Sequence, residues 1–320
     1  MKQVRILLGL SIIASFLFVL LLGGCGQQTK ESQVLKLGLL PIEENLPFYV
    51  AEQEGMFEQA GINVELISFS SAQEMLAAIQ SGQIDGEITD LIVTNLLKKG
   101  GTDVRIAAIS LGLTPLEGRF AILSSPQSSL RKVEDLKNVN IGGTENTIIH
   151  YVIDSLLTKH GFSPEEIQIT SIPKFPVRLE MLLHNEVEAA VFTDPLASFA
   201  EMQGAHLIID DTTDNISQTV IIFRNKTLEE KEQAVKVVLK VYEQAGQAIN
   251  QNPERYRDLI VVKAQVPEAL KETYKIPTYS KLQLPSEEQL SKVMQWMVSK
   301  KLLSEPFAYE ELVATTLLEE

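Results

Sequence analysis

The sequence has a single cysteine, Cys25, among its 320 residues. This count excludes a disulfide within the chain, a cluster of thiolate metal ligands and a catalytic thiol elsewhere. The four histidines are scattered without HExxH spacing, and neither a Gly-x-Ser-x-Gly sequence nor a P-loop occurs. Because these motifs are missing, we expect the protein to be no enzyme and to hold no metal or other cofactor.

Basic residues are also few, since 28 lysines and arginines stand against 42 aspartates and glutamates, a net charge of −14. Lysine and arginine form pairs such as Lys98-Lys99 but no longer run. This balance excludes a nucleic-acid backbone as the partner. The one tryptophan, Trp296, falls in a predicted C-terminal helix, where core packing explains it. A sugar ligand, which needs aromatic rings to stack on, is therefore not favoured.

Long apolar runs are missing except at the start of the chain. Lys2 and Arg5 precede a mostly apolar stretch at residues 6–22, and "LGGC" ends at Cys25. The pattern predicts a secretory signal over residues 1–24, with an ordinary signal peptide or an anchor helix as the alternative. The "LGGC" stretch resembles a bacterial lipobox, which implies lipidation of Cys25 and anchoring outside the cytoplasmic membrane. Residues 25–33 are then the lipidated cysteine and a polar tether.

From residue 34 onward, short apolar runs alternate with helical periodicity, which predicts α/β architecture with parallel-rich sheets flanked by helices. The predicted strands are residues 34–40, 62–69, 86–89, 104–111, 119–123, 139–142, 167–172, 189–192, 206–209 and 219–223. The predicted helices between them are residues 47–59, 72–80, 90–99, 148–159, 177–184 and 195–203. The C-terminal part reads as helices at residues 228–250, 253–262, 267–275 and 286–300.

The chain repeats itself at a distance of 104 residues. "SGQIDGEITD" ends with Thr89-Asp90, "HNEVEAAVFTD" ends with Thr193-Asp194, and Gly38 and Gly142 are separated by the same distance. The order of elements around the two phrases is the same, which indicates two similar α/β lobes. The repeat is imperfect, because Asp85 and Glu188 are only 103 residues apart, so one lobe is slipped by a residue.

Ligands of open parallel sheets bind beyond the carboxyl ends of the strands, where helix N-termini point. The polar residues at these turns are our candidate ligand-binding residues, and their alternative roles are helix capping for Asp90 and Asp194 and a surface position for Arg119. His150, one turn into its helix, is more typical of a structural or solvent-exposed role. The candidates are Asn45, Ser70, Ser71, Thr89, Asp90, Arg119, Thr144, Asn146, Thr147, Thr193 and Asp194.

Three stretches carry a family resemblance: "LGLLPIEENLPFYVAEQEGMFEQAGINVELI" at residues 37–67, "VEDLKNVNIGG" at 133–143 and "VFTDPLASFAEMQG" at 191–204. They resemble the substrate-binding proteins of ABC importers for nitrate, alkanesulfonates, taurine and thiamine pyrimidine precursors. The resemblance covers about residues 34–204 and supports Asn45 and also Phe48 as ligand contacts, although core packing explains Phe48 equally well. It implies a monomer that delivers a small-molecule ligand to an ABC permease and its ATPase.

The resemblance also implies the type II periplasmic-binding-protein fold, with a ligand cleft between two lobes that close by hinge motion. We expect lobe I at residues 34–113 and 216–320, lobe II at residues 119–210, and hinges near residues 113–118 and 211–217. A sensor that reports to a signalling receptor is an alternative function. An enzyme on the same fold is a second one, but the fungal pyrimidine synthase that the chain resembles carries an added cysteine-rich iron motif, which this sequence lacks.

The charges at the predicted turns bear on the ligand. Acidic residues outnumber the single basic residue Arg119, which favours a neutral or cationic ligand, such as an amine-bearing heterocycle like the thiamine pyrimidine, over a sulfonate or nitrate. In the alternative interpretation these acids cap helices or face solvent, and an anion binds backbone amides. The acidic residues are Glu43, Glu44, Asp90, Glu117, Glu145 and Asp194.

Overall fold

The computed structural model describes residues 34–318. The predicted signal peptide, Cys25 and the tether lie outside the described residues. Among the residues that are described, no helix combines the length and the hydropathy that a bilayer span requires.

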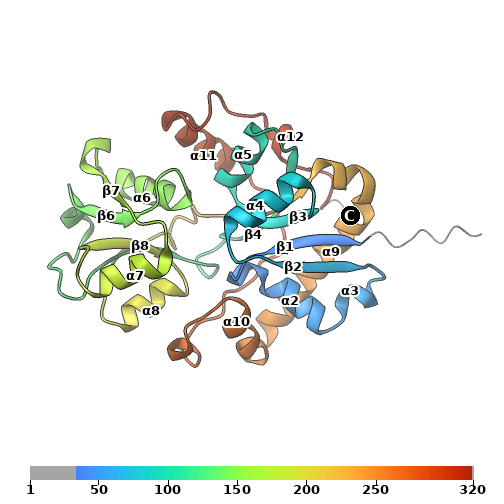
Figure 1. Cartoon of the computed structure of the whole chain (residues 1–320), viewed down its shortest axis with the longest axis horizontal. Helices are drawn as coiled ribbons and strands as arrows, with labels where there is room; N and C mark the ends of the chain where they lie inside the picture. Colours follow the sequence, from blue (N-terminus) through green and yellow to red (C-terminus); the bar gives the residue numbers. More distant parts are fainter. Residues whose placement is uncertain (1–33, 319–320) are drawn as a thin grey trace, which may run out of the picture. The chain divides into compact units, whose positions relative to one another are not determined.

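Two five-stranded sheets form the frame of the described chain (Figure 1). The first sheet has the order β2-β1-β3-β10-β4, made of β1 (Leu35–Leu39), β2 (Val64–Ser68), β3 (Gly86–Asp90), β4 (Val104–Leu111) and β10 (Thr219–Arg224). The second has the order β7-β6-β8-β5-β9, made of β5 (Phe120–Ser124), β6 (Asn140–Gly143), β7 (Gln168–Ser171), β8 (Ala189–Thr193) and β9 (His206–Asp210). We call the first sheet with its packed helices lobe 1, and the second sheet with its packed helices lobe 2.

The strand orders of the two sheets correspond position by position. In lobe 1, β1 pairs parallel with β2 and β3, while β10 pairs antiparallel with β3 and β4. In lobe 2, β6 pairs parallel with β7 and β8, while β5 pairs antiparallel with β8 and β9. The antiparallel strand of each sheet is the first strand after the chain has crossed from the other sheet. The predicted pair of parallel-rich sheets is confirmed.

The strand register confirms the one-residue slip in the repeat and locates it. Gly38 pairs with Glu87 in lobe 1, whereas Gly142 pairs with Ala190 in lobe 2, so β3 and β8 are related by 103 residues rather than 104. The last residue of β3 is Asp90 and that of β8 is Thr193. The two Thr-Asp pairs therefore lie at the same edge of equivalent strands but one residue out of step, because lobe 2 has one residue fewer between β6 and β7 than lobe 1 has between β1 and β2.

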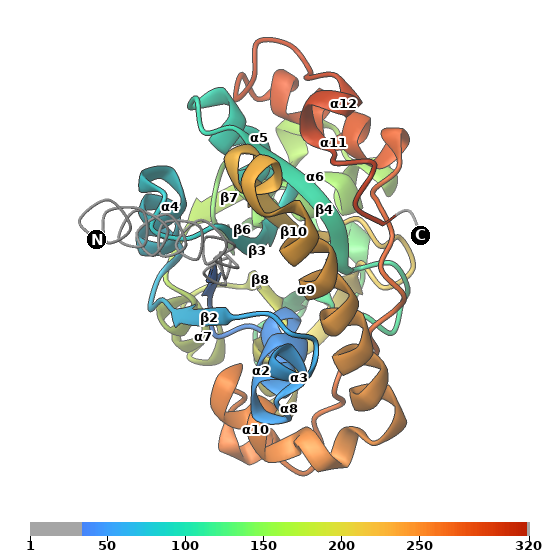
Figure 2. The same cartoon turned by 90° about the vertical axis from the view of Figure 1, so that its right-hand side faces the viewer.

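Helices cover both faces of each sheet (Figure 2). On one face of the lobe 1 sheet, apolar side chains pack against α2 (Leu46–Gln53), α3 (Met56–Gln59), α9 (Asn225–Gln251) and α10 (Arg257–Lys263). The other face packs against α4 (Ala72–Ser81), α5 (Leu91–Lys99), α11 (Glu287–Ser299) and α12 (Tyr309–Leu312). In lobe 2, α6 (Ile148–Lys159) covers one face, and α7 (Phe175–Leu183) and α8 (Leu196–Met202) cover the other.

The structure corrects two predicted helices. The expected helix 47–59 is divided into α2 and α3, because Gly55 between them adopts a left-handed conformation with φ of 65°. The expected helix 267–275 contains only a short 3₁₀ turn, Glu268–Leu270. There, the carbonyl oxygens of Lys271 and Tyr274 accept hydrogen bonds from Arg257 Nη1 at 2.6 and 2.9 Å, so a tertiary contact replaces helical bonding. Helix α12 was not predicted.

Candidate functional site

The predicted ligand contacts after β1 are buried inside lobe 1. Asn45 is 0% exposed, and its Nδ2 donates to the Leu40 carbonyl oxygen at 2.9 Å. Phe48 is 1% exposed and packs edge-to-face on Tyr242 with ring centroids 4.8 Å apart. For Phe48 the core-packing alternative is therefore the correct one, because the first turn of α2 faces the helix α9. Neither side chain forms part of an exposed surface in this structure.

The other lobe 1 candidates mostly serve their own helices. Ser71 Oγ accepts from the Glu74 N–H and caps α4, while Ser70 Oγ donates to the Glu74 carboxylate at 2.8 Å. Asp90 Oδ1 accepts from the N–H groups of Ile92 and Val93, both at 2.8 Å, and caps α5. These contacts match the capping alternative. Thr89, which precedes Asp90, is half-buried.

The lobe 2 turn after β6 is differently built. Thr147 is the N-cap of α6, but its Oγ1 donates to the Thr144 carbonyl oxygen at 2.7 Å and caps no helical N–H group. The Asn146 N–H donates to His150 Nδ1 at 3.1 Å, which gives His150 a structural role. Thr144 and Thr147 are half-buried, and Asn146 is exposed. This turn thus leaves the N-terminal end of α6 without a side-chain cap.

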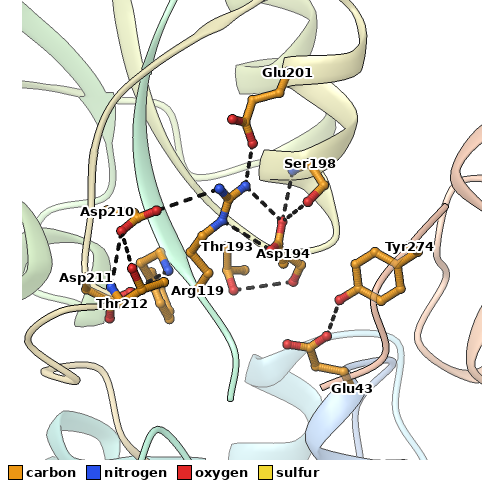
Figure 3. Close-up of polar contacts among 11 residues, drawn as sticks. Glu43, Arg119, Thr193, Asp194, Ser198, Glu201, Asp210, Asp211, Thr212 and Tyr274 are labelled. Atoms are coloured by element: carbon orange, nitrogen blue, oxygen red, sulfur yellow. Dashed lines mark hydrogen bonds and ion pairs between the residues drawn. The ribbon is translucent and has the colours of Figure 1, made fainter. Parts of the chain in front are cut away.

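Arg119 lies at the centre of a charged cluster in lobe 2 (Figure 3). Its Nε is 3.2 Å from Asp194 Oδ2, its Nη1 is 3.7 Å from Asp210 Oδ2, and its Nη2 donates to Glu201 Oε2. Burial lowers the pKa of Arg119, but Asp194 and Glu201 outweigh this effect and raise it. Three carboxylates thus surround one guanidinium, and the cluster keeps an excess of negative charge.

Asp194 connects this cluster to helix α8. Its Oδ1 accepts from the N–H and the Oγ of Ser198 at 2.9 and 2.8 Å. The other side of Asp194 faces the Glu43–Tyr274 pair of lobe 1, in which the Tyr274 hydroxyl donates to Glu43 Oε2 (Figure 3). Asp194 of lobe 2 therefore faces a carboxyl group of lobe 1.

A cavity of about 950 Å³ lies between these groups. Glu43, Arg119 and Asp194 line it, and its volume suits a small organic ligand. Its other charged lining residues are Glu201, Asp210, Glu254, Arg257 and Lys275. Of the twelve predicted ligand-binding residues, this cavity brings together Arg119 and Asp194, while the other ten do not line it.

The lobe 1 wall of this cavity carries an unusual carboxyl group. Glu43 is 5% exposed, and burial raises its pKa well above the ordinary value. The nearby carboxylates of Glu44 and Asp194 raise this pKa further, whereas the hydrogen bond from Tyr274 lowers it. Asp194 of lobe 2 thus adds, across the cavity, to the raised pKa of Glu43 in lobe 1.

The sequence interpretation missed several of these residues. Glu43 was counted among the turn acids without a binding role, and Glu201, Asp210 and Tyr274 were not candidates. Arg178 was missed as well, although a signal existed: Arg178 and the buried Leu182 are four residues apart in α7 and share a helical face. A cation on the apolar face of a helix indicates a special site.

The prediction that Trp296 packs in a core was incomplete. Its Nε1 donates to Asp154 Oδ2 of α6 at 2.8 Å, and its ring stands edge-to-face to His150 with centroids 5.2 Å apart. Lys300 Nζ reaches the same carboxylate oxygen at 2.6 Å. Helix α11 of lobe 1 therefore contacts helix α6 of lobe 2. Within residues 34–318, no cluster of three or more acidic, histidine or cysteine side chains could hold a metal ion.

A sequence model of the family described as NMT1/THI5 like matches residues 43–256 of the chain. The chain belongs to this family. Among curated proteins, a Brachyspira hyodysenteriae protein that carries the name of an ABC transporter periplasmic binding protein is 23% identical over 271 residues, which is 79% of this chain and 76% of that protein.

Solved structures of other proteins support the two-lobed fold of this NMT1/THI5-like chain. The periplasmic aliphatic sulphonate binding protein SsuA of Escherichia coli superposes with a TM-score of 0.77 at 18% identity, covering 88% of this chain and 92% of SsuA. The desulfurization enzyme DszB superposes with a TM-score of 0.69 at 16% identity, covering 89% of this chain and 97% of DszB. Binding proteins and an enzyme share this fold, so the fold alone does not decide between the two.

Proposed function

We propose that this protein is the extracytoplasmic solute-binding lipoprotein of an ABC importer. It binds a small organic solute between its lobes and delivers the solute to a membrane permease that works with an ATPase. Family membership and the name of the Brachyspira relative support the transport assignment. The signal-like N-terminus and Cys25 support lipid anchoring on the outer face of the cell membrane. The protein acts as a monomer.

Closure of the lobes uses the two crossings of the chain between the sheets, one between β4 and β5 and one between β9 and β10. We place the hinges there, at residues 113–118 and 211–217. Buried carboxylates hold the ends of both segments. Glu117 Oε2 accepts from the Leu113 N–H at 2.8 Å, and Asp211 Oδ1 accepts from the Phe120 N–H at 2.8 Å.

The ligand carries a cationic amine, and the surroundings of Arg119 are the observation that supports this assignment. Its guanidinium is matched by three carboxylates, and Arg257 on the opposite wall is paired with Glu254. Both arginines are thus already paired, and the lining as a whole has three cations, Arg119, Arg257 and Lys275, against five acidic residues. A positive group near Asp194 instead relieves the excess negative charge. Amine-bearing heterocycles, such as the thiamine pyrimidine, are thus favoured over nitrate and over sulfonates that lack an amine.

The replacement Asp194→Asn tests this proposal, because asparagine keeps an acceptor for Ser198 but removes the charge. We expect amine-bearing ligands to bind about tenfold more weakly in isothermal titration calorimetry. The control Glu134→Gln removes an equal charge from an exposed position of the same lobe and should leave the affinity unchanged. Unchanged amine affinity in Asp194→Asn, together with tighter binding of a sulfonate, would show that the cavity takes an anion.

A further inference from the structure

A contact between the two lobes lies away from the ligand cavity, where helix α11 meets helix α6 (Figure 2). Helix α11 belongs to lobe 1, because Val293 and Met297 are buried in the apolar cluster that it shares with α5 and the first sheet. Helix α6 belongs to lobe 2, because Val152 and Leu156 are buried in the core of that lobe. The contact therefore joins two elements that move with different lobes.

Trp296 of α11 is the centre of this contact. Its ring stands edge-to-face to His150 and to Tyr151 of α6, with centroids 5.2 and 5.4 Å away. Its Nε1 donates to Asp154 Oδ2 at 2.8 Å, and Lys300 Nζ lies 2.6 Å from the same oxygen. Burial raises the pKa of Asp154, but hydrogen bonds from His150, Lys300 and the indole outweigh this effect and lower it. An ionised carboxylate is thus held between the two helices.

Apolar packing extends the contact to a hinge. Tyr151 is 6% exposed and lies in the apolar cluster of lobe 1, although it comes from a helix of lobe 2. Ile216, within the proposed hinge at residues 211–217, packs against this cluster and also against the core of lobe 2. Rotation of the lobes about that hinge moves α6 relative to α11. The ring contacts and the hydrogen bond of Trp296 depend closely on distance and direction, so such a rotation breaks them.

The residues of this contact are separate from those that face the solute. His150, Tyr151, Asp154, Trp296 and Lys300 are all absent from the lining of the 950 Å³ cavity. They therefore have no direct influence on a bound solute. A contact that forms in one arrangement of two lobes and breaks in another shifts the equilibrium between the arrangements.

We propose that these five residues form an interlobe latch, which stabilises the arrangement in which Asp194 faces Glu43 across the cavity. The inference rests on the lobe closure of the proposed function and deepens it, because it assigns the side chains that regulate closure. Trp296 and Asp154 are positioning residues: they raise the population of the lobe arrangement that encloses a solute. Since the apparent affinity for a solute is proportional to this population, the latch regulates binding from outside the cavity.

Small-angle X-ray scattering of the protein without solute measures the lobe arrangement directly. We expect a larger radius of gyration in Asp154→Ala, which removes the acceptor of Trp296 and the partner of Lys300. A smaller increase is expected in Trp296→Phe, which keeps an aromatic ring but loses the N–H donor. The control Glu134→Ala removes an equal charge from an exposed position of lobe 2 and should leave the radius unchanged. The radius of the unchanged protein in both latch variants would overturn the proposal.

A second measurement uses the fact that Trp296 is the only tryptophan of the chain, so that its fluorescence reports on the latch itself. We expect emission at longer wavelength in Asp154→Ala, and a smaller shift in the milder Asp154→Asn, because the indole gains water while circular dichroism shows that both lobes stay folded. A shifted emission without a larger radius would show a purely local contact and contradict the latch. Neither measurement contains a solute, so a failed latch leaves the amine assignment, tested by Asp194→Asn, untouched.

Discussion

The two lobes repeat one frame, but each lobe buries an ionisable side chain where the other lobe has an apolar residue. Glu87 pairs with Gly38 in lobe 1, and its counterpart in lobe 2, paired with Gly142, is Ala190. Conversely, Arg178 in α7 corresponds to Met75 in α4. In lobe 2, Arg178 lies eight residues after Thr170, which pairs with Gly142; in lobe 1, Met75 lies eight residues after Ile67, which pairs with Gly38.

This difference separates the frame of the protein from its chemistry. The strand order and the glycines next to the central strands are common to both lobes, because they satisfy the same packing problem. Glu87 and Arg178 each have an apolar counterpart in the other lobe, so the frame does not need them. We therefore expect Arg178 to serve something other than the common frame, and the raised pKa of Glu87 to make folding stability depend on pH.

The largest effect is expected when lobe 1 receives the base of lobe 2, in Met75→Arg. Met75 is 2% exposed and packs among apolar side chains such as Ile79 and Ile84. An arginine there would bury an unpaired charge and lower the free energy of unfolding by more than about 4 kcal/mol. Met75→Leu, as a control of similar volume, should cost less than about 1.5 kcal/mol. Denaturant unfolding measures both, and a stable Met75→Arg protein would show that the two positions are not distinguished by polarity.

A smaller effect concerns the buried acid of lobe 1. Glu87 is 2% exposed, and burial, with a further contribution from Asp90, raises its pKa to about 8. The folded protein thus holds a proton that the unfolded chain releases near pH 4.5, so folding stability decreases as the pH rises from about 4.5 to 8. Glu87→Gln removes this loss and should be more stable than the unchanged protein at pH 8, by about 3 kcal/mol.

The range from pH 6 to 8 is the informative one for Glu87, because burial raises the pKa of Asp211 only to about 6. Unfolding free energies at pH 6, 7 and 8 should therefore decline less steeply in Glu87→Gln than in the unchanged protein. The exposed Glu134→Gln serves as the control with an equal change of charge. Equal slopes in all three proteins would mean that Glu87 is ionised in the folded state.

The smallest effect compares the N-termini of α5 and α6. Asp90→Ala removes a cap with two hydrogen bonds and should lower the unfolding free energy by about 1 kcal/mol. Thr147→Ala removes a hydroxyl that caps no N–H group of α6, so its cost should be smaller. Chemical denaturation of the two variants decides the comparison. An equal or larger loss in Thr147→Ala would mean that the hydrogen bond from Thr147 to the Thr144 carbonyl stabilises the protein as much as the cap does.

Local patterns predicted most of the frame. Helix α6 has the bounds that its apolar periodicity indicates, and the alternation of strands and helices fixes the two sheets. The failures arise where distant contacts override local preference. The segment at residues 267–275 has helical character, but Arg257 takes its carbonyl groups. The 104-residue repeat and its slip by one residue were visible in the sequence, whereas the position of the slip relative to Asp90 and Asp194 depends on strand pairing.

The candidate site was harder to predict than the frame. Turn residues such as Asp194 follow from the rule that ligands bind at the carboxyl ends of strands. Glu201 and Asp210 could not be found this way, because they reach Arg119 from a helix and from an edge strand. The burial of Phe48 depends on α9, which lies almost two hundred residues away along the chain. Side-chain environments of this kind require the tertiary structure.

A thermal-shift screen of the purified protein tests the central claim, that the cavity takes an amine-bearing solute. The panel contains thiamine pyrimidine, thiamine, riboflavin, polyamines and taurine, together with nitrate and ethanesulfonate, which lack an amine. A ligand at about 100 times its dissociation constant adds about 2.7 kcal/mol of stability, a shift of several degrees. The account predicts a shift with amine-bearing compounds. A shift with nitrate or ethanesulfonate, but with none of the amine-bearing compounds, would contradict it.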